Sequence, residues 1–392
     1  MVSIKLMKSP KKILFISHRY EPDLGGLSKS ATRISRQLAQ LGICVHVLVL
    51  TRNLPQGIVH LDRDQKPDHP TLYRMGISSR HTTTMMLALQ QVRSMHIEHS
   101  YTLFWGHYAY PNGFLACLAA REMGVASTVS IRGNDIDTAL FSGQAFSHLL
   151  WTIESATVLS CVSTQYANRL HGLSDKTINV IVLGNATDTD LFKPVSGNKS
   201  NDQITAKNNR PFVVGFSGEL REKKGLVPFM HAVEKLSTIL PLKVLIVGEV
   251  RASDQHLVDR FLEQREDLIP LITFTGHIDD PAIVADHYRK MDVLFQPSLW
   301  DGLPNSILEA MACECLVLAG EVGGVTDVID HGRNGFLLRG ADMLHAADAL
   351  IDIYHLGAEE KITICQEARR TVLNRFSLAN ERVALKSFLD FL

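Results

Sequence analysis

The sequence has no long apolar run and no excess of either charge. Its longest strongly apolar stretch, Ile43 to Leu50, is far shorter than the ~20 residues that a membrane-spanning helix needs. The 40 basic and 41 acidic side chains nearly cancel, which leaves no overall positive field for a nucleic-acid backbone. The sequence therefore predicts neither a transmembrane protein nor one that binds nucleic acid.

Cysteine frameworks and export signals are also missing. The six cysteines include no CxxC pair, and Cys313 with Cys315 has no second pair to complete a zinc site. The first residues, MVSIKLMKSPKK, contain neither a long apolar segment nor a small-residue cleavage site. These absences predict reduced core cysteines, no metal or other cofactor, and a cytoplasmic location. Peripheral contact with the inner face of a membrane stays open.

The chain does contain an alternation of short β-branched runs with helical patterns, which is typical of parallel sheets with helices on both faces. At 392 residues it exceeds the usual size of one hydrophobic core, which predicts two domains. The predicted strands are Lys12–Ser17, Cys44–Leu50, Thr102–Trp105, Ala126–Ile131 and Val158–Val162 in the first half, and Phe212–Phe216, Val244–Val247, Ile272–Thr275, Val293–Gln296 and Leu316–Ala319 in the second.

A polar segment rich in Pro, Gly, Ser, Asn and Lys follows Phe192 and separates the halves. We expect a first Rossmann-like domain over 1–193, a linker over 194–210 and a second domain over 211–375. Ligands of doubly wound sheets bind beyond the carboxyl ends of the strands. The loops that follow the strands are therefore the places to search for a site.

The loop after the first strand contains Gly25 and Gly26, which precede a helical pattern. Glycines there let a ligand approach backbone N–H groups at a helix N-terminus, although a tight turn alone explains them equally well. Ser28 is the expected cap of this helix. Because GxGxxG is absent and no acidic residue ends the second strand at Leu50, a nicotinamide cofactor is not supported.

Two loops of the second half carry charge. Gly218 to Gly225, GELREKKG, puts Arg221 and Lys224 where a strand ends and a helix begins, which suits a diphosphate, although a solvated turn would look similar. The segment PSLWDGLPNSILEAMACE at 297–314 follows another strand.

In that segment we expect Asn305 to cap a helix and Glu309 to lie near its first turn, with Asp301 and Glu309 on either side of a polyol and its nucleotide. A capped helix with an acidic first turn would explain this segment by itself. The next loop, however, begins with Gly323 and Gly324. Three consecutive glycine-rich loops therefore fall on the same side of the predicted sheet.

Together these pieces resemble the retaining glycosyltransferases of the GT-B fold, in the class called glycosyl transferases group 1 or family four. The matching segments are YEPDLGG, GNATDTDLFKP, SGELREKKG, MDVLFQPSLWDGLPNSILEAMA and GGVTDVIDHGRNGFLL, which span nearly the whole chain. The resemblance implies an α/β protein of two doubly wound domains that face each other across a cleft. It also implies that a last helix, 376–392, packs back on the N-terminal domain.

The resemblance also assigns roles to residues. It implies that Glu309 binds the donor ribose and that Asp301, or the backbone of Gly302 and Leu303, meets the donor hexose. Arg221 and Lys224 would hold the diphosphate. The expected set is His107, Arg221, Lys224 and Asp301 as catalytic residues, and Gly25, Gly26, Arg132, Gly218, Gly302, Leu303, Pro304, Asn305, Ser306 and Glu309 as donor-binding residues.

The chain departs from the family pattern at several of these places. Asp301 replaces the usual glutamate and has a shorter side chain. Glu219 stands where arginine is common, and Arg132 stands where many relatives have histidine. Asn185-Ala186-Thr187-Asp188 replaces the common Asn-Gly-Val-Asp, and Glu314 replaces a common glycine.

The expected activity is transfer of a hexose, with retention and without a metal, from a nucleotide-diphosphate sugar to a hydroxyl of a saccharide or lipid-linked saccharide. Cell-surface polysaccharide or glycolipid synthesis is the expected setting. We interpret the DxD spacings Asp135/Asp137 and Asp188/Asp190 as loop and cap residues, because neither lies in the expected donor-binding half.

Two other functions stay open. One is a GT-B-like sugar-nucleotide epimerase, against which the transferase-like spacing of Asp301 and Glu309 argues. The other is a catalytically idle nucleotide-sugar-binding protein, against which the presence of Arg221, Lys224 and Glu309 argues.

Overall fold

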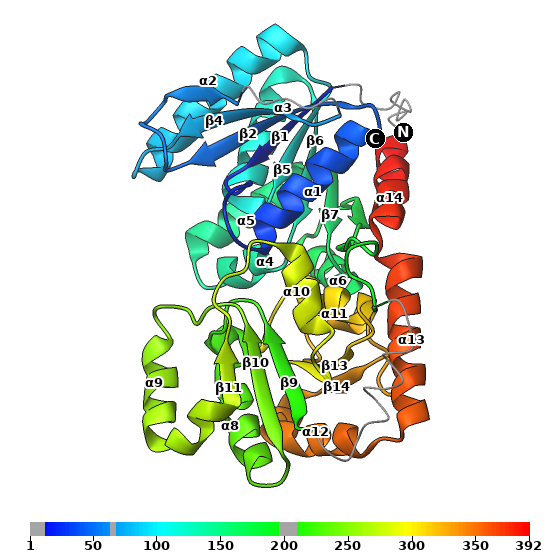
Figure 1. Ribbon diagram of the computed structural model, residues 1–392. Helices are drawn as coiled ribbons and strands as arrows, with labels where there is room; N and C mark the ends of the chain where they lie inside the picture. Colours follow the sequence, from blue (N-terminus) through cyan, green and yellow to red (C-terminus); the bar gives the residue numbers. More distant parts are fainter. Residues whose placement is uncertain (1–11, 63–67, 196–209) are drawn as a thin grey trace. The chain divides into compact units, whose positions relative to one another are not determined.

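The computed structural model describes residues 12–62, 68–195 and 210–392, so most of the predicted linker at 194–210 lies outside the described residues. The chain divides into two compact units (Figure 1). The first contains the described residues up to Asn185 together with Glu381–Leu392, and the second contains Ala186–Asn380. These boundaries differ from the 193 and 375 expected from the sequence.

The first unit is built on an eight-stranded sheet in the order β3-β4-β2-β1-β5-β6-β7-β8. Neighbouring strands are parallel except for β3 and β4, which are antiparallel. Its strands are β1 (Lys12–Ser17), β2 (Cys44–Thr51), β3 (Val59–Leu61), β4 (Thr71–Gly76), β5 (Leu103–His107), β6 (Ala126–Ile131), β7 (Val158–Cys161) and β8 (Val180–Val182). Its helices are α1 (Gly26–Gln40), α2 (His81–His99), η1 (Ala109–Gly113), α3 (Phe114–Met123), α4 (Asn134–Ala139), α5 (Gly143–Ser155), α6 (Thr164–Leu173) and most of α14 (Leu378–Phe391).

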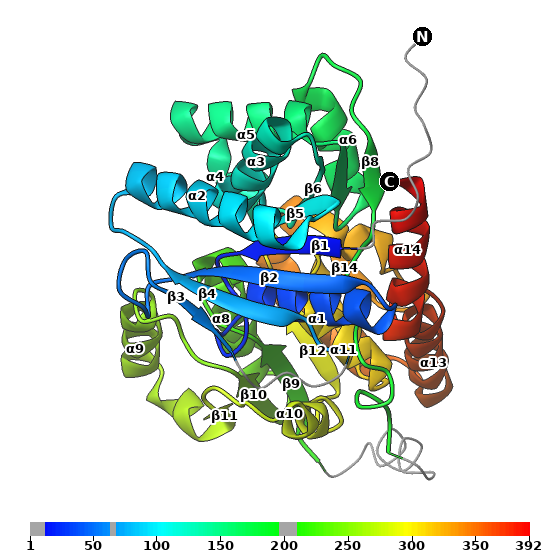
Figure 2. The same cartoon turned by 90° about the horizontal axis from the view of Figure 1, so that it is seen from above.

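Strand β1 shows how this sheet is buried on both faces. Successive side chains of a strand point to opposite faces. Ile13 and Phe15 accordingly join one core cluster, with α1 and α14, while Leu14 and Ile16 join another, with α2 and α3. Figure 2 shows α1 on one side of β1 and β2, with α2 and α3 on the other. Such two-sided burial is typical of parallel sheets and explains the continuous apolar runs of the sequence.

The C-terminal helix α14 completes the core of the first unit. Phe388 is 1% exposed, and its ring centroid lies 5.2 Å from that of Trp105 on β5. Leu385 and Leu389 are buried in the same cluster. At the start of this segment, the Glu381 carboxylate accepts hydrogen bonds from Arg33 Nε on α1 at 2.9 and 3.0 Å. Both apolar and ionic contacts therefore fix this helix.

The second unit contains a six-stranded parallel sheet in the order β11-β10-β9-β12-β13-β14. Its strands are β9 (Phe212–Ser217), β10 (Leu242–Val247), β11 (Ile272–Phe274), β12 (Val293–Gln296), β13 (Leu316–Gly320) and β14 (Phe336–Leu338). The helices are η2 (Glu222–Lys224), α8 (Leu226–Ser237), α9 (Gln255–Gln264), η3 (Glu266–Leu271), α10 (Pro281–Tyr288), α11 (Asn305–Ala312), η4 (Gly323–Asp327), η5 (Gly340–His345), α12 (Ala346–His355) and α13 (Ala358–Arg375).

The central strand β9 organises this second core. Val214 and Phe216 pack with residues of α8 and α12. At Gly215, which points to the other face, an added Cβ would lie 2.1 Å from the Met291 sulfur. The absence of a side chain there therefore lets Met291 approach the strand. Within the described ranges, no helix of either unit is long and apolar enough to cross a bilayer.

Every one of the ten predicted strands is present, and the alternating parallel architecture is confirmed. The strands β3, β4, β8 and β14 were not predicted, since three of them have only three residues and β4 is partly exposed along most of its length. The prediction that Ser28 caps α1 is wrong. The helix begins at Gly26 with Gly25 at its cap position, so Ser28 lies inside the first turn.

Replacing Phe388 with alanine should lower the free energy of unfolding of the first unit by about 3–5 kcal/mol, the usual cost of removing a buried phenylalanine ring. Urea denaturation followed by intrinsic fluorescence measures the change. Phe391→Ala is the matched control, because Phe391 lies on the same helix but is 56% exposed. Equal effects of the two substitutions would contradict the packing of α14 described above.

Candidate active site

In the second unit, the strand order reverses beside β9, which has β10 on one side and β12 on the other. Loops that follow the strands at such a switch point diverge, and doubly wound proteins bind ligands there. Gly218–Gly225 follows β9, and residues 297–304 follow β12. The two charged loops singled out by the sequence thus meet at the switch point of this sheet.

Two glycines hold three loops of this site in contact. Gly225 has a φ of +80°, and a Cβ there would lie 1.9 Å from the Pro297 carbonyl oxygen. Gly323 has a φ of +56°, and its Cβ would lie 1.9 Å from the Asp301 carbonyl oxygen. Only glycine combines a positive φ with such a close backbone approach. The loops after β9, β12 and β13 are therefore fixed against one another.

Backbone hydrogen bonds add to these contacts. The N–H of Leu299 donates to the Lys223 carbonyl at 3.0 Å, and the N–H of Gly324 donates to the Gly302 carbonyl at 2.5 Å. The N–H of Gly302 donates to Asp301 Oδ1 at 2.9 Å. Both backbone groups of Gly302 consequently have partners within these loops.

The two predicted cations have different partners. Lys224 forms an ion pair with Asp301 Oδ2, and both side chains are 18% exposed. Arg221 Nη1 lies 3.3 Å from Glu219 Oε2, which also pairs with Arg251 Nη2 at 2.8 Å. Burial lowers the pKa of Arg221, and Glu219 opposes this effect. Glu219, which replaces a common arginine, is thus neutralised by two arginines.

The Asp301 carboxylate is ionised in spite of its burial. Burial by itself would raise the pKa of this group, but the adjacent Lys224 ammonium, helped by Lys223, outweighs that effect and holds the pKa below its ordinary value. An ion pair of this kind is maintained only when both partners remain charged.

Helix α11 presents its N-terminus at the same place. It begins at Asn305 after Pro304, and no side chain of the described residues caps it, so the prediction that Asn305 is the cap is wrong. Proline takes the cap position, and its side chain has no oxygen to accept a hydrogen bond. Asn305 Oδ1 is buried and has no hydrogen-bond partner in the described part of the chain. An uncapped helix N-terminus favours a bound anion.

Glu309 is the fifth residue of α11, directly after the first turn and thus near it, as expected. Its Oε2 accepts a hydrogen bond from the Tyr288 hydroxyl at 2.8 Å, and Ser217 lies 2.8 Å from the same hydroxyl. Burial raises the pKa of Tyr288, and the Glu309 carboxylate raises it further, so Tyr288 stays protonated. Tyr288 thereby holds one oxygen of Glu309 in place.

Several buried polar atoms around the end of β12 are unpartnered. Within the described ranges, four such atoms have no hydrogen-bond partner: Nε2 and Oε1 of Gln296, Oγ of Ser298 and Nε of Arg221. Buried polar groups are rarely left unsatisfied, and the exceptions require an explanation such as water or a ligand. These atoms come from the end of β12 and from the two loops of the switch point, which makes a polar ligand there the natural explanation.

The other expected residues of this unit are placed as follows. Gly218 has a φ of +116°, and no described atom lies within 4 Å of the Cβ that would be added there. Gly302, Leu303 and Pro304 are buried, whereas Ser306 is half-buried in the first turn of α11.

The first unit has its own switch point, between β1 and β5. Gly25 and Gly26 follow β1, and no described atom lies within 4 Å of an added Cβ at either position. His107 ends β5, and its Nε2 lies 2.9 Å from the Ser30 hydroxyl on α1. Burial, reinforced by Arg132, lowers the pKa of His107 well below its ordinary value. The ring is therefore neutral at physiological pH.

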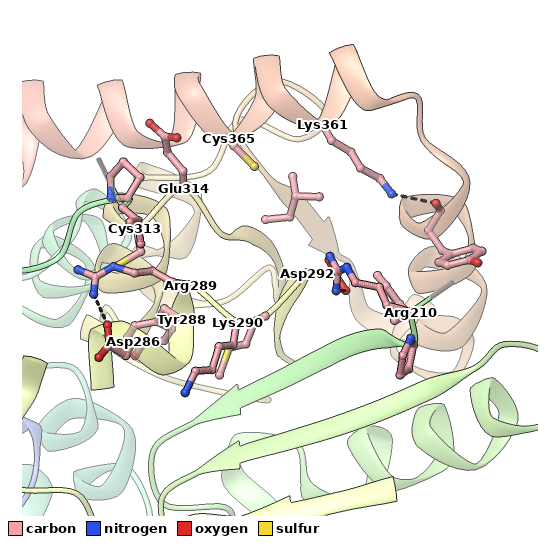
Figure 3. A pocket seen from close by; sticks show the side chains of 17 residues that line it. Arg210, Asp286, Tyr288, Arg289, Lys290, Asp292, Cys313, Glu314, Lys361 and Cys365 are labelled. Atoms are coloured by element: carbon pink, nitrogen blue, oxygen red, sulfur yellow. Dashed lines mark hydrogen bonds and ion pairs between the residues drawn. The ribbon is translucent and has the colours of Figure 1, made fainter. Parts of the chain in front are cut away.

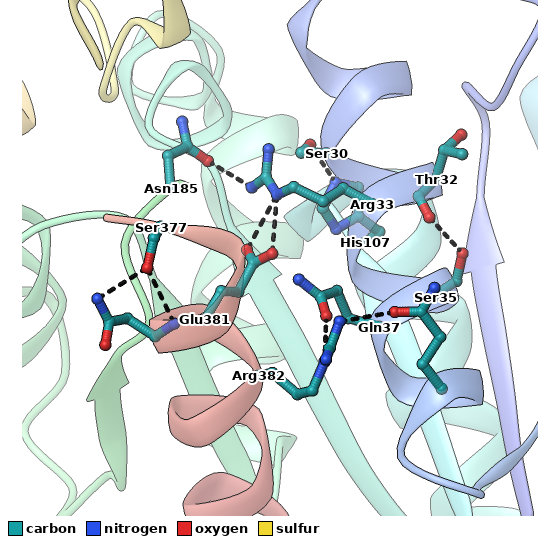
Figure 4. A network of polar contacts seen from close by, with 12 residues as sticks. Ser30, Thr32, Arg33, Ser35, Gln37, His107, Asn185, Ser377, Glu381 and Arg382 are labelled. Carbon is teal, nitrogen blue, oxygen red and sulfur yellow. Dashed lines mark hydrogen bonds and ion pairs between the residues drawn. The ribbon is translucent and has the colours of Figure 1, made fainter. Parts of the chain in front are cut away.

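The Asn185 side chain belongs to a polar network with Arg33 and Glu381 (Figure 4), and Arg132 also donates to it. Asn185 Oδ1 accepts hydrogen bonds from Arg132 and, at 3.1 Å, from Arg33, which in turn pairs with Glu381. Burial lowers the pKa of Arg132 to about 10, and Arg33 contributes to the shift. Asn185, the first residue of the altered Asn-Ala-Thr-Asp segment, thus serves as an acceptor between two guanidinium groups.

His18, which the sequence reasoning did not single out, lies beside this site. Asn112 Nδ2 donates to its Nδ1 at 2.7 Å and to the His107 carbonyl at 2.6 Å. Burial, with a contribution from Arg19, lowers the pKa of His18 to about 4. The contact between His18 and Asn112 joins residues 94 positions apart, and no local sequence pattern reveals it.

The DxD spacings are used in loop structure. Asp135 accepts hydrogen bonds from the N–H groups of Ala109, Arg132 and Gly133, and Asp188 accepts from those of Asp190 and Leu191. Asp137 pairs with Arg169. In the described part of the chain, no group of three or more His, Cys, Asp or Glu residues is arranged to hold a metal ion.

A cavity of about 290 Å³ opens at the amino ends of β9, β12 and β13 in the second unit (Figure 3). Three of its cations have partners in the protein: Arg210 pairs with Asp292, Arg289 pairs with Asp286, and Lys361 donates to the Tyr354 carbonyl. The cavity is thus at the edge of the sheet opposite to the charged loops. It does not contain the candidate site.

Comparison with known proteins agrees with this geometry. A family profile described as "Glycosyl transferases group 1" matches residues 211–355, and one described as "Glycosyl transferase 4-like domain" matches residues 25–186. The chain belongs to the glycosyl transferases group 1 family. It is a glycosyltransferase that uses a nucleotide sugar.

Individual relatives are distant but extend over nearly the full chain. N-acetyl-α-D-glucosaminyl L-malate synthase of Bacillus anthracis is 24% identical, with 91% of each chain covered. A GDP-mannose-dependent α-mannosyltransferase of Mycolicibacterium smegmatis is 26% identical, with 93% of each covered. Sucrose-phosphate synthase of Thermosynechococcus elongatus, 19% identical, superimposes with a TM-score of 0.77 over 96% of this chain and 98% of its own. This similarity shows the GT-B fold.

The pKa of His18 leads to a prediction about pH. In the unfolded chain His18 takes up a proton near pH 6.5, but in the folded protein it does so only near pH 4. The unfolded state therefore binds more protons in this interval, and stability should fall as the pH is lowered from about 6.5 to 4. In His18→Asn, the free energy of unfolding should fall less between pH 7 and pH 5 than in the wild type. Urea denaturation at the two pH values measures the difference.

Part of the pH dependence should remain in that variant, because the pKa of His107 is lowered in the same direction. His171→Asn, at an exposed position on α6, is the matched control and should keep the wild-type dependence. An identical dependence in His18→Asn and the wild type would contradict the neutral state of the half-buried His18.

Proposed function

We propose that this glycosyltransferase moves a hexose, with retention of configuration, from a nucleotide-diphosphate sugar to an acceptor hydroxyl. Retention follows from family membership. The observation that carries the proposal is the switch point of the second unit, where Arg221, Lys224 and the uncapped N-terminus of α11 gather. Three sources of positive charge at one place suit a diphosphate.

The same arrangement provides for the chemistry. In glycosyl transfer the anomeric carbon becomes oxocarbenium-like while negative charge develops on the departing diphosphate. Cations and helix N–H groups that are already oriented stabilise this charge without reorganisation in the transition state. Lys224, Arg221 and α11 would supply that stabilisation in this chain, and the mechanism would not require a metal.

Glu309 is our candidate for the ribose hydroxyls. Its Oε2 is held by the Tyr288 hydroxyl, and the side chain is only half-buried. A carboxylate that is oriented by one hydrogen bond can accept others from neighbouring hydroxyl groups. The unpartnered atoms Gln296 Nε2 and Oε1, Ser298 Oγ and Asn305 Oδ1 offer further donors and acceptors to a polar ligand.

The first unit is the proposed acceptor-binding unit. His107 and Arg132 at the ends of β5 and β6 are its candidates for contact with the reacting groups. We propose a saccharide or lipid-linked saccharide as the acceptor, in the synthesis of a cell-surface polysaccharide or glycolipid. Support comes from relatives whose names refer to capsular polysaccharide and teichuronic acid biosynthesis.

A thermal-shift screen against UDP-, GDP-, ADP- and dTDP-sugars tests the donor proposal. A ligand that binds only the folded state raises its apparent stability, by about 2.7 kcal/mol at a hundredfold excess over Kd. We expect one nucleotide series to raise the melting temperature, equally with and without a chelator. A shift abolished by the chelator and restored by a divalent metal would overturn the metal-independent mechanism.

Replacement of Glu309 by alanine should weaken donor binding about tenfold or more, as expected for loss of a charged hydrogen-bond acceptor. Isothermal titration with the nucleotide sugar found by the screen measures the effect. Glu263→Ala, at an exposed position on α9, is the control and should bind as the wild type does. Unchanged affinity in Glu309→Ala would remove Glu309 from the site.

Turnover separates the transferase from an idle binder. Release of nucleoside diphosphate that depends on an added saccharide acceptor is the expected result. Donor binding without any such release, across a panel of lipid-linked and free saccharides, would favour the idle nucleotide-sugar-binding protein.

A further inference from the structure

Asp301 occupies the position at which the family resemblance implies contact with the donor hexose, yet its carboxylate is already engaged. Oδ2 is paired with the Lys224 ammonium, and Oδ1 accepts the Gly302 N–H at 2.9 Å. The side chain is 18% exposed, so little of it faces solvent. Both oxygens of this carboxylate therefore have partners in the protein.

The partner of Asp301 is Lys224, whose flexible side chain requires a contact that fixes the position of its ammonium group. A lysine side chain has four flexible carbons, and it loses substantial conformational entropy when its ammonium is fixed at one point. Lys224 ends the short helix η2, directly before Gly225, and Gly225 is pressed against Pro297. The backbone is thus fixed by that contact, and the ion pair with Asp301 fixes the end of the side chain.

The surroundings strengthen this arrangement. The Leu299 N–H binds the Lys223 carbonyl at 3.0 Å, and the Lys223 ammonium lies 5.8 Å from the centre of the Trp300 ring. Two adjacent lysines of one loop therefore both contact the loop that carries Asp301. The low pKa of Asp301 has the same origin, because Lys224 and Lys223 outweigh its burial.

The backbone of Gly302, which follows Asp301, is also engaged within the protein. The Gly302 N–H binds Asp301, and the Gly302 carbonyl accepts the Gly324 N–H at 2.5 Å. An aspartate is shorter than the usual glutamate by one methylene. Its Oδ1 closes the turn on the Gly302 N–H, and its Oδ2 meets the lysine.

We propose that Asp301 is a positioning residue, which holds the Lys224 ammonium at the diphosphate-binding loop and does not contact the donor sugar. This inference rests on the proposed function, because it assumes that the switch point of the second unit binds the donor. It has a specific consequence. Asp301 should contribute to binding of the diphosphate group, which is present both in a nucleoside diphosphate and in the corresponding nucleotide sugar.

The test compares these two ligands in Asp301→Asn. Isothermal titration measures the affinity for the nucleoside diphosphate and for the nucleotide sugar, the nucleotide being chosen by titrating UDP, GDP, ADP and dTDP into the wild type. We expect both affinities to fall by the same factor, about tenfold, as for one charge-assisted hydrogen bond. An unchanged affinity for the nucleoside diphosphate, with a loss only for the nucleotide sugar, would overturn the proposal.

A double-mutant cycle provides a second readout, which a merely structural role of Asp301 would not produce. If Asp301 acts through Lys224, Lys224→Met should lower both affinities, and adding Asp301→Asn should lower them little further. Independent effects that multiply in the double variant would contradict the proposal. Asp301→Glu restores a carboxylate and should recover most of the affinity for the nucleoside diphosphate.

Asp348→Asn is the matched control, because Asp348 pairs with Lys235 in the same unit, with both side chains about half exposed. It should bind both ligands as the wild type does. If Asp301→Asn fails to fold, the comparison of Asp301→Glu with Lys224→Met still decides, since a Glu variant as weak as the Met variant towards the nucleoside diphosphate would overturn the proposal. Failure of the wild type to bind any nucleotide would instead refute the proposed function.

Discussion

The close backbone approaches at Gly225 and Gly323 are the constraint on which the second unit's site depends. Each brings a Cα to a position where a β-carbon would lie 1.9 Å from a carbonyl oxygen, and each also requires a positive φ. These approaches fix the loops after β9, β12 and β13 against one another. The ion pair of Lys224 with Asp301 and the uncapped N-terminus of α11 follow from these contacts, because all of them belong to the same three loops.

Much of the fold could be predicted because its signals are local and periodic. Strands such as β1 and β12 are continuous apolar runs, since both faces of a parallel sheet are buried. Three-residue strands such as β8 and β14 carry too few positions for a period to be seen. The antiparallel pairing of β3 was also invisible, because it depends on a partner, β4, that is itself partly exposed.

The candidate site was predictable in its loops but not in its contacts. Spacing placed Arg221, Lys224, Asp301 and Glu309 in loops and helix starts that lie at the carboxyl end of one sheet. The predicted cap at Asn305 was wrong because the preceding Pro304 already occupies the cap position. The partners of the predicted residues come from elsewhere, as Tyr288 does for Glu309 and Ser30 does for His107. Only the folded chain brings such pairs together.

The return of residues 381–392 to the first unit has a consequence for how the protein is made in the cell. A ribosome finishes the first unit's sheet and α1 early, but the helix that covers Trp105 and pairs with Arg33 emerges only after residues 186–380 have been synthesised. During that time an apolar face around Trp105 has no cover, and such surface is where nascent chains associate wrongly or bind chaperones. The second unit is contiguous in sequence, so it is the first that can complete its core. The residues of the first unit's core are thus complete only after those of the second unit have been synthesised.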